Sequence, residues 1–443
     1  MKDRAEIKIK FYLALIFSSF FLIRASCLWS LSSDSNWPQI EIISLEKTPA
    51  NLALLASFSE PPDFLLETIE RIYLVARPQE LTSFQSAGLV YRLETSLFPP
   101  ARPRMNELSL ASGGNGAYHS YQELATEMKN LAEKFPFICR LEEIGRSLEG
   151  RSILALKISD RVELDEAEPA FLFLGCHHAR EWISVEVPFY LARYLVENYS
   201  QQPLIQKLVN EAQIWIVPLV NPDGLEYSIK FYRYWRKNRR LNSDGSFGVD
   251  LNRNYGFKWG VDNRGSSPNP ASETYRGPAP FSEPETRAVR DLFLKYPFQA
   301  LISYHSYSQV ILFPWGYTRT PPDKYQLLFN LARKMSDLMV TVHGRRYDYG
   351  QASTMLYLTN GDTTDWAYGL AGIPAFTIEL PPVDIFQGGF FNAESDIQPI
   401  FEENLKAALD LIQWGISNYH YVAPLTRNNK DSIISFIRKN KKR

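Results

Sequence analysis

Two histidines and a glutamate in the segment GCHHAREW (175–182) could bind a metal ion. His178 and Glu181 stand three residues apart, a spacing that lets an imidazole and a carboxylate converge on one ion. His305, which follows the apolar run ALISY (300–304), could supply a third ligand and leave a fourth position for water. Three protein ligands are typical of a catalytic zinc site, because structural zinc sites are closed and usually rich in cysteine.

These residues also have structural explanations that their spacing does not exclude. A single histidine after an apolar run, such as His305, is often a hydrogen-bonded core residue. A chain with six histidines can also contain a His-x-x-Glu pattern by chance. Because His177 and His178 are adjacent, the octet alone leaves open which of them is the ligand.

Four other segments carry polar residues suited to charge stabilisation and proton transfer. Each has an ordinary alternative, since basic runs are usually solvated faces, an Asn-Arg pair is often a turn and a tyrosine is most often packed. Only their combination is informative. The candidates are Arg236 in YWRKNRR (234–240), Asn252 and Arg253 in DLNRNY (250–255), Tyr357 in MLYLTNGDTTDW (355–366) and Glu379 in FTIEL (376–380).

Composition limits the kind of protein that can present these residues. The chain has 443 residues, of which 45% are hydrophobic and 14% aromatic, so it can bury a large core and exceeds the usual size of one domain. Its formal net charge of -1 gives no electrostatic reason to expect a nucleic-acid partner.

The N-terminus has the layout of a secretory signal peptide. Four Lys or Arg among the first ten residues precede the apolar run 11–23, and the small residues Ala25 and Ser26 follow it. The run is too short to span a bilayer comfortably, so we expect residues 1–26 to be a signal peptide and the mature protein to be secreted or periplasmic, without a stable membrane span. A retained anchor is the alternative. Lipidation at Cys27 is disfavoured, because Arg24 stands where such a signal needs an apolar residue.

The elements that must position the candidate residues form an α/β pattern. Residues 27–104 predict a small α/β unit, 105–116 a cleavable linker rich in small residues, 117–422 an α/β domain with a central sheet, and 423–443 a basic tail. Sites in such domains lie at strand ends and in loops. The clearest strands are 152–158, 170–175, 214–220, 300–304 and 375–380, and the clearest helices are 121–135, 188–199 and 401–419.

The combined motifs resemble the zinc metallocarboxypeptidases of the carboxypeptidase A and B type, also called funnelins. HxRE, NPDG, WRK, DxNRN, HSYSQ and GDTTDW occur in the family's order, His305 lies 124 residues after Glu181, and Glu379 lies 14 after Asp365. The resemblance covers about residues 117 to 420, and the secreted bacterial carboxypeptidase T group looks nearest. It implies a mixed central sheet flanked by helices, preceded by a small α/β prodomain.

The resemblance also implies a role for each candidate residue. One Zn²⁺ per chain would be held by His178, Glu181 and His305, so that His177 is only a neighbour. Glu379 would be the general base and Arg236 would stabilise the oxyanion. The substrate would be a peptide with a free C-terminal carboxylate. The residues expected to bind it are Arg180, Asn252, Arg253, Tyr307, Tyr357, Asp362 and Thr364.

Within that family, the position of Thr364 largely sets the preferred C-terminal side chain. Threonine neither repels an apolar side chain nor neutralises a cation, whereas Asp362 could reach a lysine or arginine. We therefore expect a mixed preference for apolar, aromatic and basic residues, unless Asp362 caps a turn. Residues 27–104 would be a propeptide that caps the cleft until an activating protease cuts near Arg102 or Arg104; a unit that stays attached is the alternative.

Further expectations concern calcium, the cysteines and the function. The segment DEAEP (165–169) resembles a calcium-binding loop of the carboxypeptidase T group, although acidic surface loops are common. Cys139 and Cys176, the cysteines left after signal removal, could form one disulfide, but two buried free thiols are preferred. Two other functions are weighed against the main one: a peptidase of cell-wall muropeptides on the same fold, and a non-catalytic binding module, which would usually have lost Glu379 or Arg236.

Overall fold

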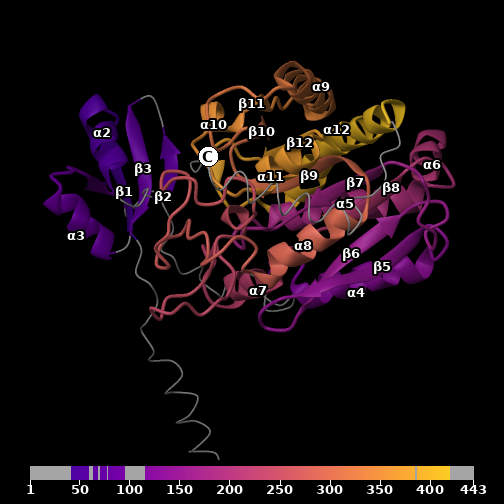
Figure 1. Ribbon diagram of the computed structural model, residues 1–443, viewed down its shortest axis with the longest axis horizontal. Coiled ribbons are helices and arrows are strands. Elements are labelled where there is room, and N and C mark those ends of the chain that lie inside the picture. Colours follow the sequence, from indigo (N-terminus) through magenta and orange to yellow (C-terminus); the bar gives the residue numbers. More distant parts are fainter. Residues whose placement is uncertain are drawn as a thin grey trace, which may run out of the picture.

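The computed structural model contains two units, each built on its own β-sheet (Figure 1). The predicted signal peptide, most of the predicted linker and the basic tail 423–443 lie outside the described residues. No helix in the described part of the chain is long and apolar enough to cross a membrane. The structure describes residues 41–58, 63–67, 70–76, 78–94, 115–384 and 387–419.

The N-terminal unit is a four-stranded sheet, in the order β2-β3-β1-β4, with two helices. Ile43 and Leu45 alternate with Ile42 and Ser44 along β1, so the sheet has two different faces. Ile43 and Leu45 pack in a core that includes Leu55 of α2. The elements are β1 (Glu41–Glu46), α2 (Pro49–Ser57), β2 (Asp63–Glu67), β3 (Arg71–Ala76), α3 (Pro78–Ser86) and β4 (Arg92–Leu93).

The second unit is an eight-stranded sheet in the order β11-β10-β12-β9-β7-β8-β6-β5. The central strands β12, β9, β7 and β8 are parallel to one another. Antiparallel pairs join β10 to β12, β6 to β8 and β5 to β6. The expected mixed sheet is therefore confirmed. Its strands are β5 (Cys139–Arg146), β6 (Ser152–Ile158), β7 (Ala170–Leu174), β8 (Gln213–Val217), β9 (Phe298–Ser306), β10 (Val310–Phe313), β11 (Asp348–Gln351) and β12 (Ala375–Leu380).

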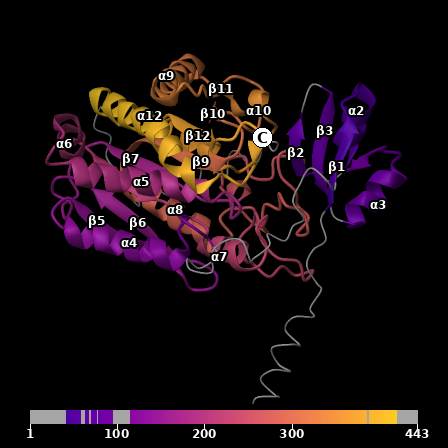
Figure 2. The same ribbon diagram turned by 180° about the vertical axis from the view of Figure 1, so that it is seen from behind.

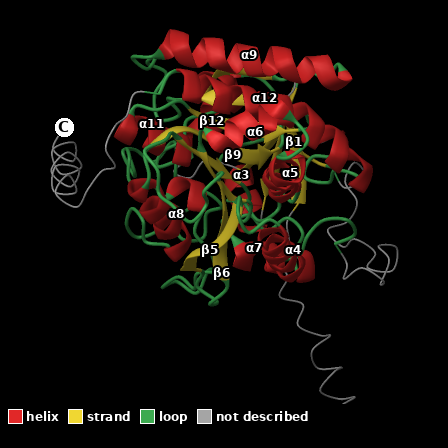
Figure 3. Ribbon diagram, turned by 90° about the vertical axis from the view of Figure 1, so that its right-hand side faces the viewer, coloured by secondary structure: helices red, strands yellow, loops and turns green. Residues whose placement is uncertain are grey.

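Helices cover both faces of this sheet, because its central strands are apolar throughout. Every residue of β7 and β8 is buried, which requires a cover on each side. Figure 3 shows α8 and α11 on one side and α4 and α5 on the other. The helices are α4 (Tyr121–Lys134), α5 (Ile183–Asn198), α6 (Pro203–Asn210), α7 (Pro222–Lys230), α8 (Pro284–Lys295), α9 (Tyr325–His343), α10 (Ala352–Met355), α11 (Thr363–Ala371) and α12 (Ile397–Ser417), with the 3-10 turns η1 (Leu251–Arg253) and η3 (Glu394–Asp396).

The helix expected over 188–199 begins five residues earlier, at Ile183, and contains Pro188. Proline cannot donate to the carbonyl four residues before it, so the oxygen of Ser184 has no partner in the helix ladder. That oxygen lies against Gly175, where it would be 2.1 Å from a Cβ atom. Glycine at position 175 therefore lets β7 and this turn of the helix approach closely.

One smaller expectation can be compared with the fold. Cys139 and Cys176 are both buried and free, as preferred from the sequence.

Candidate active site

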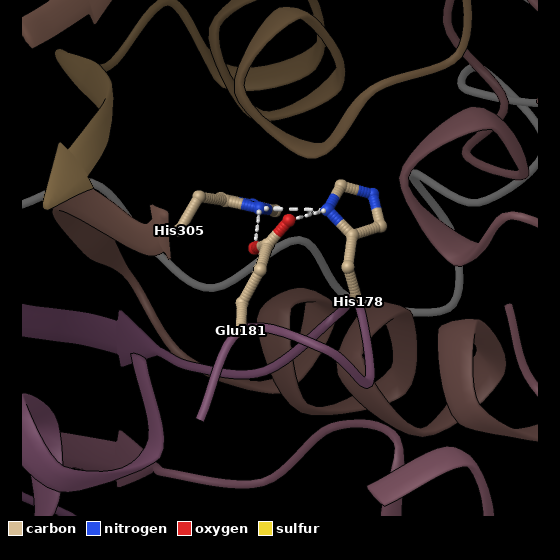
Figure 4. A group of neighbouring side chains, drawn as sticks. All are labelled: His178, Glu181 and His305. Atoms are coloured by element: carbon tan, nitrogen blue, oxygen red, sulfur yellow. Dashed lines mark hydrogen bonds and ion pairs between the residues drawn. The ribbon is translucent and has the colours of Figure 1, made fainter. Parts of the chain in front are cut away.

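The three expected metal ligands meet at the carboxyl edge of the parallel strands (Figure 4). His178 and Glu181 lie in the corner that leaves β7, and His305 is the penultimate residue of the neighbouring strand β9. The carboxylate oxygens of Glu181 lie 2.7 Å from His178 Nδ1 and 3.0 Å from His305 Nδ1. The two Nδ1 atoms lie 3.1 Å apart. The strand order therefore brings together residues that are 124 positions apart in the sequence.

The chemistry of this trio fits a divalent cation. One ligand atom from each residue lies within 4.8 Å of the others, and all three side chains are buried. Although burial opposes its charge, the imidazoles of His178 and His305 hold the pKa of Glu181 well below its usual range. Burial lowers the pKa of His305, which favours the neutral imidazole that a metal needs. Two facing imidazole nitrogens and a buried carboxylate are typical of zinc ligands.

His177 is not part of this trio, because its ring nitrogens have other partners, and this resolves the ambiguity of the paired histidines. Its ring nitrogens bond Tyr255 Oη at 2.8 Å and Ser303 Oγ at 3.3 Å. His178 is therefore the histidine that faces Glu181 and His305.

Asp250 connects the metal-binding residues to Arg236, and sequence reasoning did not single it out. Its Oδ1 lies 3.1 Å from His178 Nε2, and its Oδ2 accepts from Arg236 at 2.8 Å. The same carboxylate caps η1 by accepting from Asn252 N at 2.9 Å. A carboxylate behind a ligand histidine orients the ring and raises its basicity. The available signal was its position two residues before Asn252 in DLNRNY.

Asn252 and Arg253 lie on η1, and both side chains carry nitrogen donors. Asn252 Oδ1 accepts from Thr363 N and Thr363 Oγ1, at 3.0 and 2.8 Å, so its amide nitrogen, which lies 3.5 Å from His305 Nε2, is the end that donates. Arg253 is buried, and its Nε has no hydrogen-bond partner among the described residues. A buried guanidinium with an unused donor fits an anionic ligand.

Glu379 lies on β12, directly opposite His305 in the parallel register. Burial raises the pKa of its carboxyl well above the usual range, and the charge of Glu181 adds to this, against Arg236 and Arg253. A carboxyl group with a raised pKa beside a metal site is suited to accept and return a proton.

Tyr357 is the expected site residue that the structure does not bring to the others. It follows the short helix α10 and is 49% exposed. None of the described hydrogen bonds joins it to Asn252 or Arg253. Its loop position explains the difference, since a loop conformation is not fixed by strand order.

Asp362, expected beside the substrate side chain, caps the N-terminus of α11. Its Oδ1 accepts from Asp365 N at 2.8 Å and from Thr364 Oγ1 at 3.0 Å, and its Oδ2 accepts from Thr359 Oγ1 at 2.6 Å. The hydroxyl oxygens of Thr364 and Thr377 in turn lie 3.5 Å apart. The capping alternative considered from the sequence is thus the observed geometry.

The two remaining candidates form an aromatic platform with residues of the loop 387–392. The guanidinium of Arg180 lies 4.3 Å from the ring centre of Phe390, and Tyr307 meets the same ring at 4.8 Å. Tyr73, from β3 of the N-terminal unit, packs with Phe390 and with Tyr234. Figures 1 and 2 show that unit beside the loops of the larger one.

Comparisons with known proteins agree with this geometry. Residues 124–407 match the zinc carboxypeptidase family, Peptidase_M14. The chain is 37% identical over 296 residues to carboxypeptidase B of Astacus astacus, and the alignment covers 66% of this chain and 94% of that protein. It is 31% identical over 380 residues to carboxypeptidase A2 of Mus musculus, which covers 82% of this chain and 88% of the other.

A solved structure of thrombin-activatable fibrinolysis inhibitor extends the likeness to the N-terminal unit. It superposes with a TM-score of 0.71 at 28% identity and covers 86% of this chain and 100% of that one. These matches support the A and B types, and the nearer resemblance to carboxypeptidase T stays an expectation. The chain therefore belongs to the zinc carboxypeptidase family and is a zinc metallocarboxypeptidase, a hydrolase of peptide bonds.

Proposed function

We propose that this enzyme is an exported exopeptidase that removes the C-terminal residue of peptides and proteins and is made as a zymogen. The observation that carries the proposal is the unused donor of Arg253, buried on η1 next to the metal-binding residues. Metal and base alone could cut internal bonds, whereas a fixed cation selects a free terminal carboxylate.

The residues at the metal site divide the reaction between them. When bound by His178, Glu181 and His305, the zinc ion supplies Lewis-acid polarisation and lowers the pKa of the attacking water. Glu379 takes the proton from that water and delivers it to the leaving amine. Arg236, oriented by Asp250, stabilises the negative charge on the former carbonyl oxygen.

The clamp and the platform would orient the substrate for this chemistry. Asn252 presents its amide nitrogen because its oxygen is held by Thr363, and Arg253 supplies the charge. Arg180 and Tyr307, stacked on Phe390, would contact the peptide further from its terminus. The resemblance implies that Tyr357 is the third residue of the clamp, and we propose that its exposed loop moves on binding to bring it there.

The zymogen proposal is supported by the contact between Tyr73 and this platform. A peptide that enters over Phe390 would meet the N-terminal unit. Residues 27–104 would therefore act as a propeptide until an activating protease cuts the connecting segment, with 105–116 as linker. Export rests on the N-terminal pattern alone.

Side-chain preference follows from the capping role of Asp362. The mixed preference expected from the sequence needs a carboxylate oxygen that can meet lysine or arginine, but both oxygens of Asp362 accept bonds from its own helix turn and Thr359. Within that mixed preference, we propose that apolar and aromatic C-terminal residues are the better substrates and that acidic ones are rejected.

Calcium binding beside the segment 165–169 is a further part of the proposal. The segment 165–169 contributes Glu166 and Glu168 to a carboxylate group that Asp160 completes, with oxygens within 4.8 Å of one another. Burial raises the pKa of Glu168 to about 7, and the charges of Glu166 and Asp160 add to the shift. Carboxylates in this arrangement can hold Ca²⁺, yet Arg161 already pairs with Glu166.

The decisive experiment compares a free-acid peptide with its C-terminal amide. The chain without its signal is treated with trypsin, and release of the last residue is followed with and without a chelator. We expect turnover of the acid only, lost with the chelator, and a much higher KM for the acid in Arg253→Ala. Equal rates on acid and amide would reject the proposal. Muropeptides in the same panel test the cell-wall alternative, and a lack of any turnover would favour the binding module.

A further inference from the structure

His177 is a fully buried histidine that the reaction, as described above, does not use. Its Nδ1 lies 3.3 Å from Ser303 Oγ, and its Nε2 lies 2.8 Å from Tyr255 Oη and 3.1 Å from Thr363 Oγ1. Its ring stacks on the ring of His305, with centres 5.5 Å apart and an angle of 16°. Both nitrogens of a buried imidazole are thus in use beside a metal ligand.

The donors in this group can be assigned from Asn252. Its Oδ1 accepts from the backbone N–H of Thr363, so it must be the amide oxygen, and the Thr363 hydroxyl also donates to it. That hydroxyl has no proton left for His177. Because the Thr363 oxygen, 3.1 Å from Nε2, can then only accept, the Nε2 of His177 donates to it and to Tyr255 Oη, and its Nδ1 is an acceptor.

The assignment continues from His177 to the metal ligand. Since Nδ1 of His177 accepts, the hydroxyl of Ser303 donates to it. The oxygen of Ser303 then accepts from Nε2–H of His305, 3.0 Å away. The amide nitrogen of Asn252, 3.5 Å from the same Nε2, is also a donor and makes no hydrogen bond to it in this arrangement. Nδ1 of His305 is left without a proton, and it is the atom that faces His178 and Glu181 (Figure 4). A continuous chain of hydrogen bonds links this ligand to Asn252.

We propose that His177 is a positioning residue that, through Ser303, fixes His305 in the tautomer and orientation needed for zinc, and that ties this ligand through Thr363 to the clamp residue Asn252. The proposal rests on the ligand set given above. Partners behind a ligand histidine typically change metal affinity by about 10- to 100-fold when removed.

The test measures zinc affinity by competition with a chelator, independently of activity. His177→Phe keeps a buried ring but removes both nitrogens, and Ser303→Ala removes the next link with little change in volume. We expect each to bind zinc about 10- to 100-fold more weakly, and the double variant to be no weaker than the worse single one. His177→Asn, whose amide can replace Nδ1, should recover most of the affinity. His119→Phe, a change at another buried histidine, is the matched control and should bind zinc normally.

Two outcomes separate failure of this inference from failure of the ligand set. If His305→Ala loses zinc while His177→Phe and Ser303→Ala bind it as tightly as the unchanged chain, His177 has no positioning role. If His305→Ala and His178→Ala still hold one zinc ion tightly, the ligand set is wrong. Should His177→Phe not fold, Ser303→Ala decides, together with the ¹⁵N–¹H signal of His305 Nε2 in the zinc-loaded protein. That signal must shift in Ser303→Ala, and an unchanged shift would overturn the proposal.

Discussion

The two sheets of this molecule bury their faces in different ways. The eight-stranded sheet has its own helices on both sides, whereas the described part of the four-stranded sheet packs its helices on one face only. Its other face, with Ile42 and Tyr73, lies against Tyr234 and Phe390 of the catalytic unit. The catalytic unit is therefore complete by itself, and the N-terminal unit has a face that the catalytic unit completes.

The small core of the N-terminal unit also makes that unit dependent on the catalytic unit. Eight described residues form the inner core of the N-terminal unit, and such small cores give marginal stability. The face of this sheet that lies against the catalytic unit also buries Ser44, which bonds Arg71 and Glu94. The interface between the two units is therefore partly polar. Once the connecting segment is cut, this unit has little apolar surface to hold it in place, which suits a propeptide that must leave.

The largest expected effect is a fall in the catalytic rate when the proposed base is replaced. Glu379→Gln removes the base but no metal ligand, so we expect kcat to fall by about 10²- to 10⁴-fold while zinc stays near one ion per chain. Metal analysis beside steady-state kinetics measures both. His178→Ala is the comparison and should lose zinc and activity together. Loss of zinc in Glu379→Gln, or activity within a few-fold of the unchanged enzyme, would contradict the role of base.

The next effect concerns His119, which ties the start of the catalytic unit to α5. Its backbone N and its Nδ1 bond Glu186 at 2.9 and 2.7 Å. Burial disfavours the charged ring, but the hydrogen bond and charge of Glu186, with Glu127, raise the pKa of His119 to about 9. Because the folded pKa is above the unfolded value, this stabilisation is complete below about pH 6.5 and is lost as pH rises through about 9.

We therefore expect the free energy of unfolding of the activated enzyme to fall by about 2 to 3 kcal/mol from this group between pH 6 and 10. Urea titrations at several pH values measure it. His119→Gln should flatten that part of the pH profile, and an equal slope in the variant would exclude His119 as the cause.

A smaller effect tests the contact between the two units. Tyr73→Ala removes a buried ring from the interface, so the uncut zymogen should gain about 10-fold in activity on a small peptide. Val90→Ala, an 82% exposed position on the same unit, is the control and should change nothing. A zymogen that stays as silent with Tyr73→Ala as without it would show that Tyr73 does not maintain the inhibition.

Much of the site was predictable because strand ends determine it. His178, His305 and Glu379 lie at or near the ends of buried apolar runs, and parallel neighbours bring such ends together. The fold class followed from the same runs. Short or polar elements were harder to predict from the sequence, since β10 and β11 have four residues each and α3 is largely polar.

What the sequence did not show depends on which residues become neighbours. Asp250 and Ser303 act through partners more than fifty residues away, and no local pattern reveals such partners. The role of Tyr357 stays a prediction, because its exposed loop is not positioned by strand order. Asp362 had a readable signal, since an aspartate directly before a helix commonly caps it.

The smallest expected effect tests whether the charge of Asp362 influences which C-terminal side chain the enzyme accepts. Asparagine caps helices about as well as aspartate, so Asp362→Asn should keep α11 in place while removing the charge. Because both oxygens of Asp362 are held by Thr359, Thr364 and Asp365, we expect kcat/KM for peptides ending in Lys, Arg, Leu and Phe to change by the same factor, within about threefold. A selective loss of tenfold or more for Lys and Arg would show that the carboxylate is felt in the pocket despite its bonds, and would restore basic residues as full substrates beside the apolar ones.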